Sequence, residues 1–236
     1  MPFRATHRRA VTPQHRGRFP GFDVLAQAEQ WDEVTAGVVL ARLGLPSMLS
    51  FFTDEEVAIA APLLDLLLAQ DSDPKVPVLA LVDDRLAAGE TDGWHYDDMP
   101  EDGQAWRDTL AALDDDARKQ HDAGYAELST ARQARLLQDV QDLADAGDMW
   151  HDWLGSHVWS LWTRYACTAF YSHLWAWNEM GFSGPAYPRG YLNPGVNARE
   201  SYEVADHRGT DPVPFATRVE RARRADADLP AERRNG

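Results

Sequence analysis

Four side chains that could ligate a metal ion lie between residues 151 and 179 of this 236-residue chain: His151, His157, His173 and Glu179. Helical metal sites place their ligands on one face, usually as pairs spaced by three or four residues. No two of these histidines have that spacing, although His173 and Glu179 could meet across a helix end. A stand-alone helical metal-dependent enzyme is therefore an alternative function and not the leading one.

Carboxylates are concentrated between residues 83 and 116, which hold twelve acidic residues against two arginines. Clustered carboxylates are the ligands that Ca²⁺ prefers. These acids do not follow the spacing of an EF-hand loop, and no glycine lies at its turning position. A solvated acidic surface is the favoured interpretation.

Motifs for nucleophilic catalysis and nucleotide binding are missing from the sequence. No Gly-x-Ser-x-Gly elbow is present, no Gly-x-Gly-x-x-Gly follows a strand, and there is no Walker-type loop. We therefore expect no catalytic, cofactor-binding or metal-binding residues in this chain. The single cysteine, Cys167, excludes an internal disulfide, and we expect it to be a buried structural thiol.

Aromatic side chains gather near the C-terminal end. Six of the nine tryptophans lie within 150–177, and a glycine- and proline-rich run follows at 178–191. Tryptophan and tyrosine suit both protein cores and protein–protein contacts. Trp159 and Trp162, three residues apart, favour the core, whereas burial is less assured for the last two tryptophans. An aromatic segment that forms neither helix nor interior strand is expected to be covered by another protein.

We predict that ten residues of this arm bind a partner. Its prolines lower the ordering cost of binding because their φ is already fixed. Arg189 lies close to two tyrosines and has the composition of an interface anchor. The ten residues are Trp175, Trp177, Asn178, Glu179, Phe182, Pro185, Tyr187, Pro188, Arg189 and Tyr191.

The elements that must position this arm are expected to be helices. The clearest start is at Thr53, whose side chain can cap the amide of Glu56 while Glu56 reaches back. This helix should run to about Leu68, with Pro62 kinking it or starting a second segment.

Apolar residues recur at helical spacing in several later segments. Thr130 and Gln133 indicate a second capping box. Residues 22–43 are compatible with a helix or an extended segment, and no stretch alternates as a strand does. The expected helices are 77–89, 104–122, 130–145 and 156–174, with a loop at 90–103.

These elements predict an all-α protein: a single helical domain of about five to seven helices, an extended aromatic, glycine- and proline-rich C-terminal arm, and disordered termini. The expected boundaries are a disordered basic tail at 1–20, the helical domain at 21–176, the extended partner-binding arm at 177–215 and a flexible tail at 216–236.

The amino-acid composition excludes some classes of binding partner. The formal net charge is −15 and the isoelectric point is near 4.8, which argues against nucleic-acid binding because phosphates require a basic face. No apolar run is long enough for membrane insertion. Arg8 and Arg9 resemble a twin-arginine export signal, but its apolar stretch does not follow. The expected location is therefore the cytoplasm.

Four segments carry a resemblance to a known family: 51–56 (FFTDEE), 63–71 (LLDLLLAQD), 77–83 (PVLALVD) and 170–191 (FYSHLWAWNEMGFSGPAYPRGY). The first three are ordinary helix sequence, whereas the last is long and unusual. On these residues the chain resembles the gluconate 2-dehydrogenase subunit 3 family, the small subunits of FAD-dependent sugar and polyol dehydrogenases. The resemblance extends from about residue 20 to residue 203.

The resemblance implies a non-catalytic subunit without a cofactor of its own. In such complexes a large glucose–methanol–choline (GMC) type flavoprotein, which carries FAD, oxidises the sugar, and a cytochrome c or another acceptor takes the electrons. The small subunit binds the large one, supports its folding and, in many members, supports its export. Export with the partner is the alternative to the cytoplasm, and a transient assembly chaperone is the alternative to a resident subunit.

Overall fold

A computed structural model describes residues 10–19, 21–44, 48–193, 195 and 198–205. Apart from Ala205, these residues belong to one compact unit. The expected flexible tail at 216–236 lies outside the described residues, as do residues 1–9 and 20 of the expected N-terminal tail and residues 206–215 of the expected arm.

The described residues form an all-α fold, as the sequence predicts. They contain seven α-helices, three short 3-10 helices and one small hairpin of two-residue strands, β1 (Met149–Trp150) and β2 (Trp153–Leu154), which the sequence did not indicate. The α-helices are α1 (Glu33–Ala41), α2 (Asp54–Leu67), α3 (Val78–Ala87), α4 (Asp102–His121), α5 (Thr130–Ala146), α6 (Gly155–Ser172) and α7 (Leu174–Met180).

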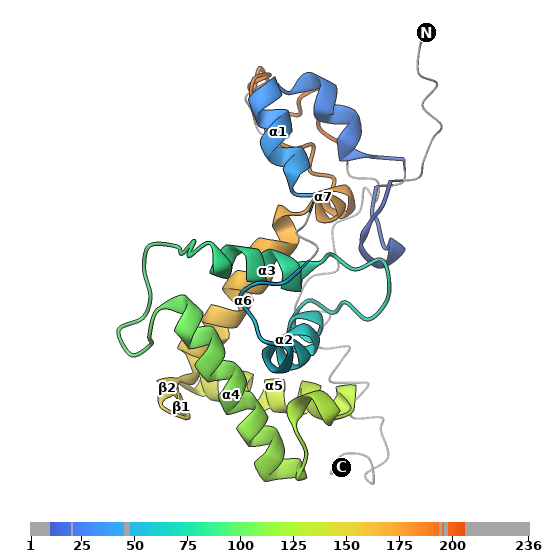
Figure 1. Ribbon diagram of the computed structural model, residues 1–236. Helices are drawn as coiled ribbons and strands as arrows, with labels where there is room; N and C mark the ends of the chain where they lie inside the picture. The colour runs from blue at the N-terminus through green and yellow to red at the C-terminus, as the bar shows by residue number, and fades with distance from the viewer. Residues whose placement is uncertain (1–9, 20, 45–47, 194, 196–197, 206–236) are drawn as a thin grey trace. The chain divides into compact units, whose positions relative to one another are not determined.

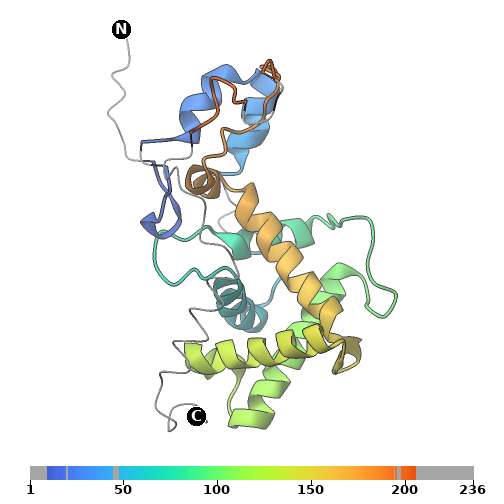
Figure 2. The ribbon, with the colours of Figure 1, turned by 180° about the vertical axis from the view of Figure 1, so that it is seen from behind.

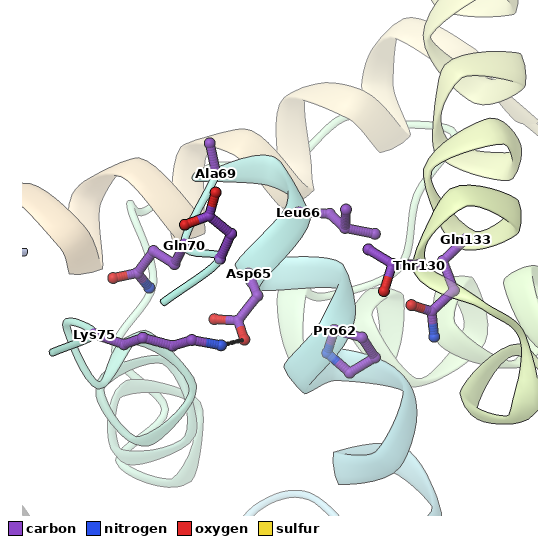
Figure 3. A pocket seen from close by; sticks show the side chains of 9 residues that line it. Pro62, Asp65, Leu66, Ala69, Gln70, Lys75, Thr130 and Gln133 are labelled. Atoms are coloured by element: carbon purple, nitrogen blue, oxygen red, sulfur yellow. Dashed lines mark hydrogen bonds and ion pairs between the residues drawn. The ribbon is translucent and has the colours of Figure 1, made fainter. Parts of the chain in front are cut away.

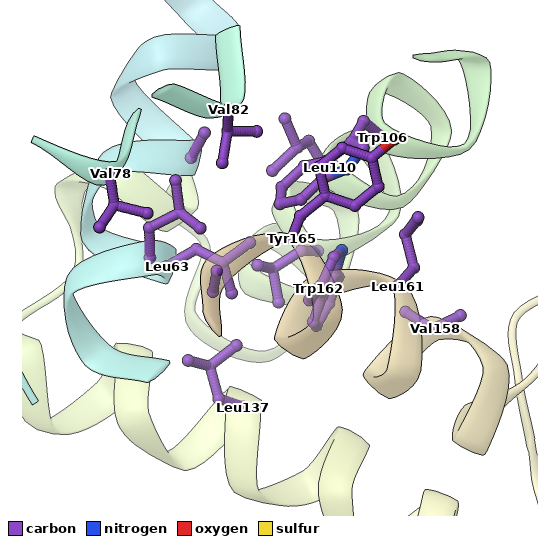
Figure 4. Close-up of a cluster of buried hydrophobic side chains, with 14 of the residues drawn as sticks. Leu63, Val78, Val82, Trp106, Leu110, Leu137, Val158, Leu161, Trp162 and Tyr165 are labelled. Carbon is purple, nitrogen blue, oxygen red and sulfur yellow. The ribbon is translucent and has the colours of Figure 1, made fainter. Parts of the chain in front are cut away.

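Helix α6 organises the main core. It contacts α2, α3, α4 and α5, and its C-terminal end leads into α7 (Figures 1 and 2). Three of its side chains, Trp162, Tyr165 and Val158, are fully buried against α2, α3 and α4 (Figure 4). The Trp162 Nε1 donates to the Thr109 hydroxyl at 3.0 Å, so the buried indole keeps a polar partner. The four helices around α6 form a packed body that holds the base of the arm.

The start of α2 confirms the strongest local signal in the sequence. The Thr53 hydroxyl accepts a hydrogen bond from the Glu56 amide at 3.2 Å, and the Glu56 carboxylate accepts from the Thr53 amide at 2.9 Å. One helix continues through Pro62 without the expected second segment. The proline leaves the carbonyl of Ala58 without its helical donor, and Ala58 is exposed to water, which can replace it.

Thr53→Ala should lower the free energy of unfolding by about 1 kcal/mol, because the Glu56 amide in the first turn loses its acceptor, the Thr53 hydroxyl. Urea unfolding followed by circular dichroism measures this difference. Thr168→Ala, on the exposed side of α6, is the matched control and should lose no stability. Equal stability of Thr53→Ala and the wild type would show that the Thr53 hydroxyl contributes nothing.

The expected capping box at Thr130 is wrong. Helix α5 takes Ser129 as its N-cap residue without a side-chain hydrogen bond. The side-chain amide of Gln133 (Nε2) instead donates to the Tyr125 carbonyl at 3.0 Å, inside the body. The Gln133 side chain therefore bonds to the buried Tyr125 carbonyl, eight residues away, instead of forming the local capping box.

The two ends of the described chain pack on each other in what we call the terminal module, the described residues of 10–48 and 171–204. Its own small core consists of Val24, Trp31, Val39, Leu174 and Trp177. Both ribbon views show the N-terminal segment and α1 beside α7 and the residues that follow it (Figures 1 and 2). Residues 22–43, for which the sequence left helix and extended structure open, are largely helical, with η2 at Val24–Gln30 and then α1.

Residues 10–19 differ from the expected flexible tail. They include η1 (Pro13–His15), and the Gln14 amide and side chain bond to the carbonyls of Pro74 and Ala69 at 2.8 and 2.9 Å. Arg16 also pairs with Asp71 at 3.1 Å. The segment is thus fastened to the loop that follows α2, by contacts more than fifty residues apart in sequence.

Candidate partner-binding site

Helix α7 forms the base of the arm and is buried in the terminal module. The Trp177 side chain is only 5% exposed, its Nε1 donates to the Tyr171 carbonyl at 2.7 Å, and the Arg42 guanidinium lies over its ring. The expectation that the chain is extended from residue 177 is wrong for residues 177–180, which belong to α7. Trp177 is a core residue of the module and is shielded from contact with a partner.

Asn178 joins the arm to the N-terminal segment. Its Oδ1 accepts a hydrogen bond from the Val24 amide at 2.7 Å, and its Nδ2 donates to the Val11 carbonyl at 2.9 Å. The residue is 3% exposed. Because its amide oxygen and nitrogen are both used internally, Asn178 has a structural role in joining the two segments.

Two glycines let the chain turn after α7 and pass close to aromatic rings. Gly181 and Gly184 have φ of 72° and 78°, a left-handed backbone that disfavours other residues. A Cβ atom at Gly181 would lie 2.7 Å from the Phe19 ring, and one at Gly184 would collide with the Trp31 ring. The arm therefore folds back onto the N-terminal segment, where an extended arm was expected.

Arg189 holds the arm together from inside. Its guanidinium donates to Gln27 Oε1 at 2.9 Å and to the carbonyls of Ser183 and Pro185 at 3.2 and 3.0 Å. The Tyr202 ring covers the guanidinium at 3.7 Å. With these contacts Arg189 positions the arm.

A second turn closes the arm behind Arg189. The Glu200 carboxylate is 7% exposed and accepts from the amides of Leu192 and Asn193, both at 2.6 Å. The Tyr202 hydroxyl donates to the Gly190 carbonyl at 2.9 Å, and the Ser183 hydroxyl donates to the Tyr202 carbonyl at 2.6 Å. Residues 181–193 of the arm thus form a compact loop held by internal hydrogen bonds, and such preorganisation reduces the ordering cost of binding.

The compact loop points several large side chains into solvent. Tyr187 is 65% exposed, Tyr191 67% and Leu192 81%. Phe182 is 43% exposed and packs its ring edge-on against Trp177 at 5.0 Å. Leu192 was missed by sequence reasoning, which stopped at the last aromatic residue of the run.

The other predicted contact residues are divided between surface and interior. Pro188 is exposed, and Pro185 is half-buried. Trp175 is half-buried against the core of the body. Glu179 is half-buried, and desolvation raises the pKa of its carboxyl group, which Arg16 and Arg18 partly oppose. Partner contact remains an expectation for all residues of the arm, and the exposed ones are those that can make it directly.

The four candidate metal ligands do not converge. His151 pairs with Asp116 at 2.9 Å, and His157 pairs with Asp98 at 2.7 Å. His173 lies in the buried turn between α6 and α7, and its Nδ1 accepts from the Trp175 amide at 3.3 Å. Within the described residues, one acidic group with ligand spacing combines His151 with Asp115 and Asp116. Exposed acids gather in this way without an ion, so the group carries no assignment.

His173 makes stability depend on pH. Burial lowers the pKa of its imidazole from 6.5 to about 4. Since the unfolded chain binds the proton first, stability is complete above pH 6.5 and falls as the pH decreases toward 4, by roughly 3 kcal/mol in all. His173→Asn keeps an acceptor for the helix start without this titration. Urea unfolding at pH 7 and pH 4.5 should show a larger loss for the wild type than for the variant, and parallel losses would contradict the assignment.

Cys167 is exposed, which corrects the expectation of a buried thiol. On α6 the neighbouring Ala166 and Phe170 take the buried side, so the cysteine faces outward. It borders a surface hollow of about 500 Å³ together with Glu179 and Met180.

A second hollow, of about 290 Å³, lies between α2, the loop after it and α5 (Figure 3). Three of its polar side chains already have partners. Lys75 pairs with Asp65 at 2.5 Å, and the Gln70 side chain bonds to both the amide and the carbonyl of Val76. A ligand entering here would meet no converging set of free polar groups, so the hollow is not a candidate active site.

No helix in the described residues combines the length and hydropathy that crossing a membrane requires. An all-α body with apolar side chains presented by a preformed loop has the features of a subunit that binds another protein.

The comparison with protein families agrees with this class. The model of the family described as gluconate 2-dehydrogenase subunit 3 matches residues 54–184, more than half of the chain. The chain therefore belongs to the gluconate 2-dehydrogenase subunit 3 family, whose name describes one subunit of a dehydrogenase complex. No curated protein and no solved structure gives a significant match.

Proposed function

We propose that this chain is the non-catalytic small subunit of an FAD-dependent, GMC-type sugar or polyol dehydrogenase. It binds and stabilises the large flavoprotein subunit, which carries the FAD and oxidises the substrate. Electrons then pass to a cytochrome c or another acceptor. The compact loop carries the proposal, because it presents Tyr187, Tyr191 and Leu192 on a backbone held by internal hydrogen bonds.

The large exposed rings fit a protein partner better than a small substrate. Tyrosine and tryptophan dominate the residues that carry binding energy at protein interfaces, and rigid presentation lowers the entropy lost on association. The chain belongs to a family of dehydrogenase subunits, so the partner of this surface would be another subunit of a dehydrogenase complex.

Co-expression tests the proposal. A candidate large GMC-type flavoprotein from the same organism is produced with and without this chain, and soluble FAD-loaded protein and dehydrogenase activity are measured. We expect both quantities to fall strongly when the small subunit is omitted, because the flavoprotein then exposes the apolar surface that the subunit covers. Equal solubility and activity without this chain would contradict the proposal.

Two alternatives are separated by simple measurements on the same material. Size-exclusion chromatography of the mature complex distinguishes a resident subunit, which elutes with the flavoprotein, from a transient assembly chaperone, which does not. Elemental analysis of the purified chain tests a stand-alone metal-dependent enzyme, which requires a stoichiometric metal ion.

A further inference from the structure

Exposed apolar side chains are concentrated in the terminal module. The described residues include fifteen large hydrophobic side chains that are exposed, and thirteen of them lie in the module. Only Trp94 and Met149 lie on the body, although the body is the larger part of the fold. Soluble proteins rarely concentrate exposed apolar side chains in one region unless that region is covered by something.

Charged side chains show the opposite distribution, because they are concentrated in the body, residues 49–170. Residues 49–170 contain 25 acidic and eight basic residues, a balance of −17. The module contains seven acidic and five basic residues, a balance of −2. The body thus has a strongly hydrated surface that disfavours close contact, whereas the module is nearly neutral and loses little hydration when it is covered.

Seven of the thirteen exposed apolar side chains of the module come from its N-terminal part. Val34 and Val38 are 74% and 59% exposed and lie four residues apart, so they share one face of α1. Leu43 and Met48, which follow the helix in sequence, are also exposed, at 39% and 79%. Sequence reasoning gave this segment no role in binding.

Helix α1 is held firmly enough to present this face. Its first turn is capped by Asp32, whose carboxylate accepts from the Thr35 amide at 2.8 Å. Val39 on the other side of the helix is 3% exposed and belongs to the core of the module. After the helix, Arg42 donates to the Ser172 carbonyl at 3.2 Å. The packing of the described residues therefore leaves this apolar face of α1 exposed to solvent.

We propose that the Val34–Val38 face of α1 is a second docking surface for the same large flavoprotein subunit, beside the surface of the arm. This inference rests on the proposed function and deepens it. The N-terminal segment and the arm are connected through Gln27 and Arg189, which hydrogen-bond at 2.9 Å, so one partner can engage both. The partner surface facing α1 is apolar and carries little charge, because α1 offers it apolar side chains and almost no net charge.

Binding measurements on the full chain test the inference. The probe is the purified large flavoprotein subunit, and the dissociation constant is measured by biolayer interferometry. The double variant Val34→Asp with Val38→Asp should weaken binding by at least about tenfold, since it places two charges in a desolvated apolar contact. Met149→Asp, an exposed apolar residue of the body, is the matched control and should change the constant less than twofold.

The outcomes separate this inference from the proposed function. No binding of the wild type to the flavoprotein overturns both. Wild-type affinity for the α1 double variant, with weakened binding of Tyr187→Ala and Tyr191→Ala, overturns the inference alone. A wild-type homodimer that the α1 variant converts to monomer without changing flavoprotein affinity also overturns it, because α1 then contacts a second copy. Thermal unfolding of each variant confirms that the fold is intact.

Discussion

Trp177→Ala should unfold the terminal module and leave the helical body folded. The indole is a central side chain of the small core that also contains Val24, Trp31 and Val39. Truncation of a buried tryptophan costs about 3–5 kcal/mol, through lost burial and the cavity left behind. That loss exceeds what a core of so few side chains can absorb. The main core around α6 has its own set of buried residues and should persist.

Hydrogen exchange read by mass spectrometry distinguishes the two regions. Amides of residues 24–41 and 174–184 should lose protection in Trp177→Ala, whereas those of α4 and α6 should keep it. Trp94→Ala removes an exposed tryptophan from the body and is the matched control, with protection unchanged. Wild-type protection throughout the module, together with weaker partner binding, would mean that Trp177 acts at the interface instead.

Tyr187→Ala combined with Tyr191→Ala should weaken binding of the large subunit by about 2 kcal/mol or more, which is roughly a thirtyfold rise in the dissociation constant. Both rings are mostly exposed, so their loss leaves no cavity in the module. The free energy of unfolding should therefore stay within about 0.5 kcal/mol of the wild type.

Titration calorimetry against the purified large subunit measures this effect, and Met149→Ala on the body serves as the control. A stable double variant with unchanged affinity would remove the arm from the interface. A large loss of stability would mean that the rings support the loop and that their exposure is misleading.

Local signals in the sequence predicted the body well. The capping box at Thr53 and the apolar spacing through Leu161, Trp162 and Tyr165 depend on residues within one or two turns of each other, so a helix can be read from them directly. The expected helix end at Gly89 lies two residues beyond the observed end of α3 at Ala87. These features need no information about distant parts of the chain.

The terminal module could not be predicted because long-range contacts define it. Val24 and Asn178 are 154 residues apart in sequence, and neither residue type indicates the other. The N-terminal segment lacks a clear period, and its arginines resembled those of a disordered tail. The internal contacts of Arg189 could not be predicted for the same reason: the acceptors that hold its guanidinium include Gln27, 162 residues away in the sequence. Composition identified the arm as unusual without showing that the chain itself covers its base.

Hydrogen–deuterium exchange of the full chain, alone and with the large flavoprotein subunit, tests the central claim most directly. We predict new protection at residues 33–41 and 181–192 in the complex, with little change on the acidic surface of α4. New protection confined to α4 and α5, or no new protection at a saturating concentration of the partner, would contradict the claim that this subunit binds its flavoprotein through the terminal module.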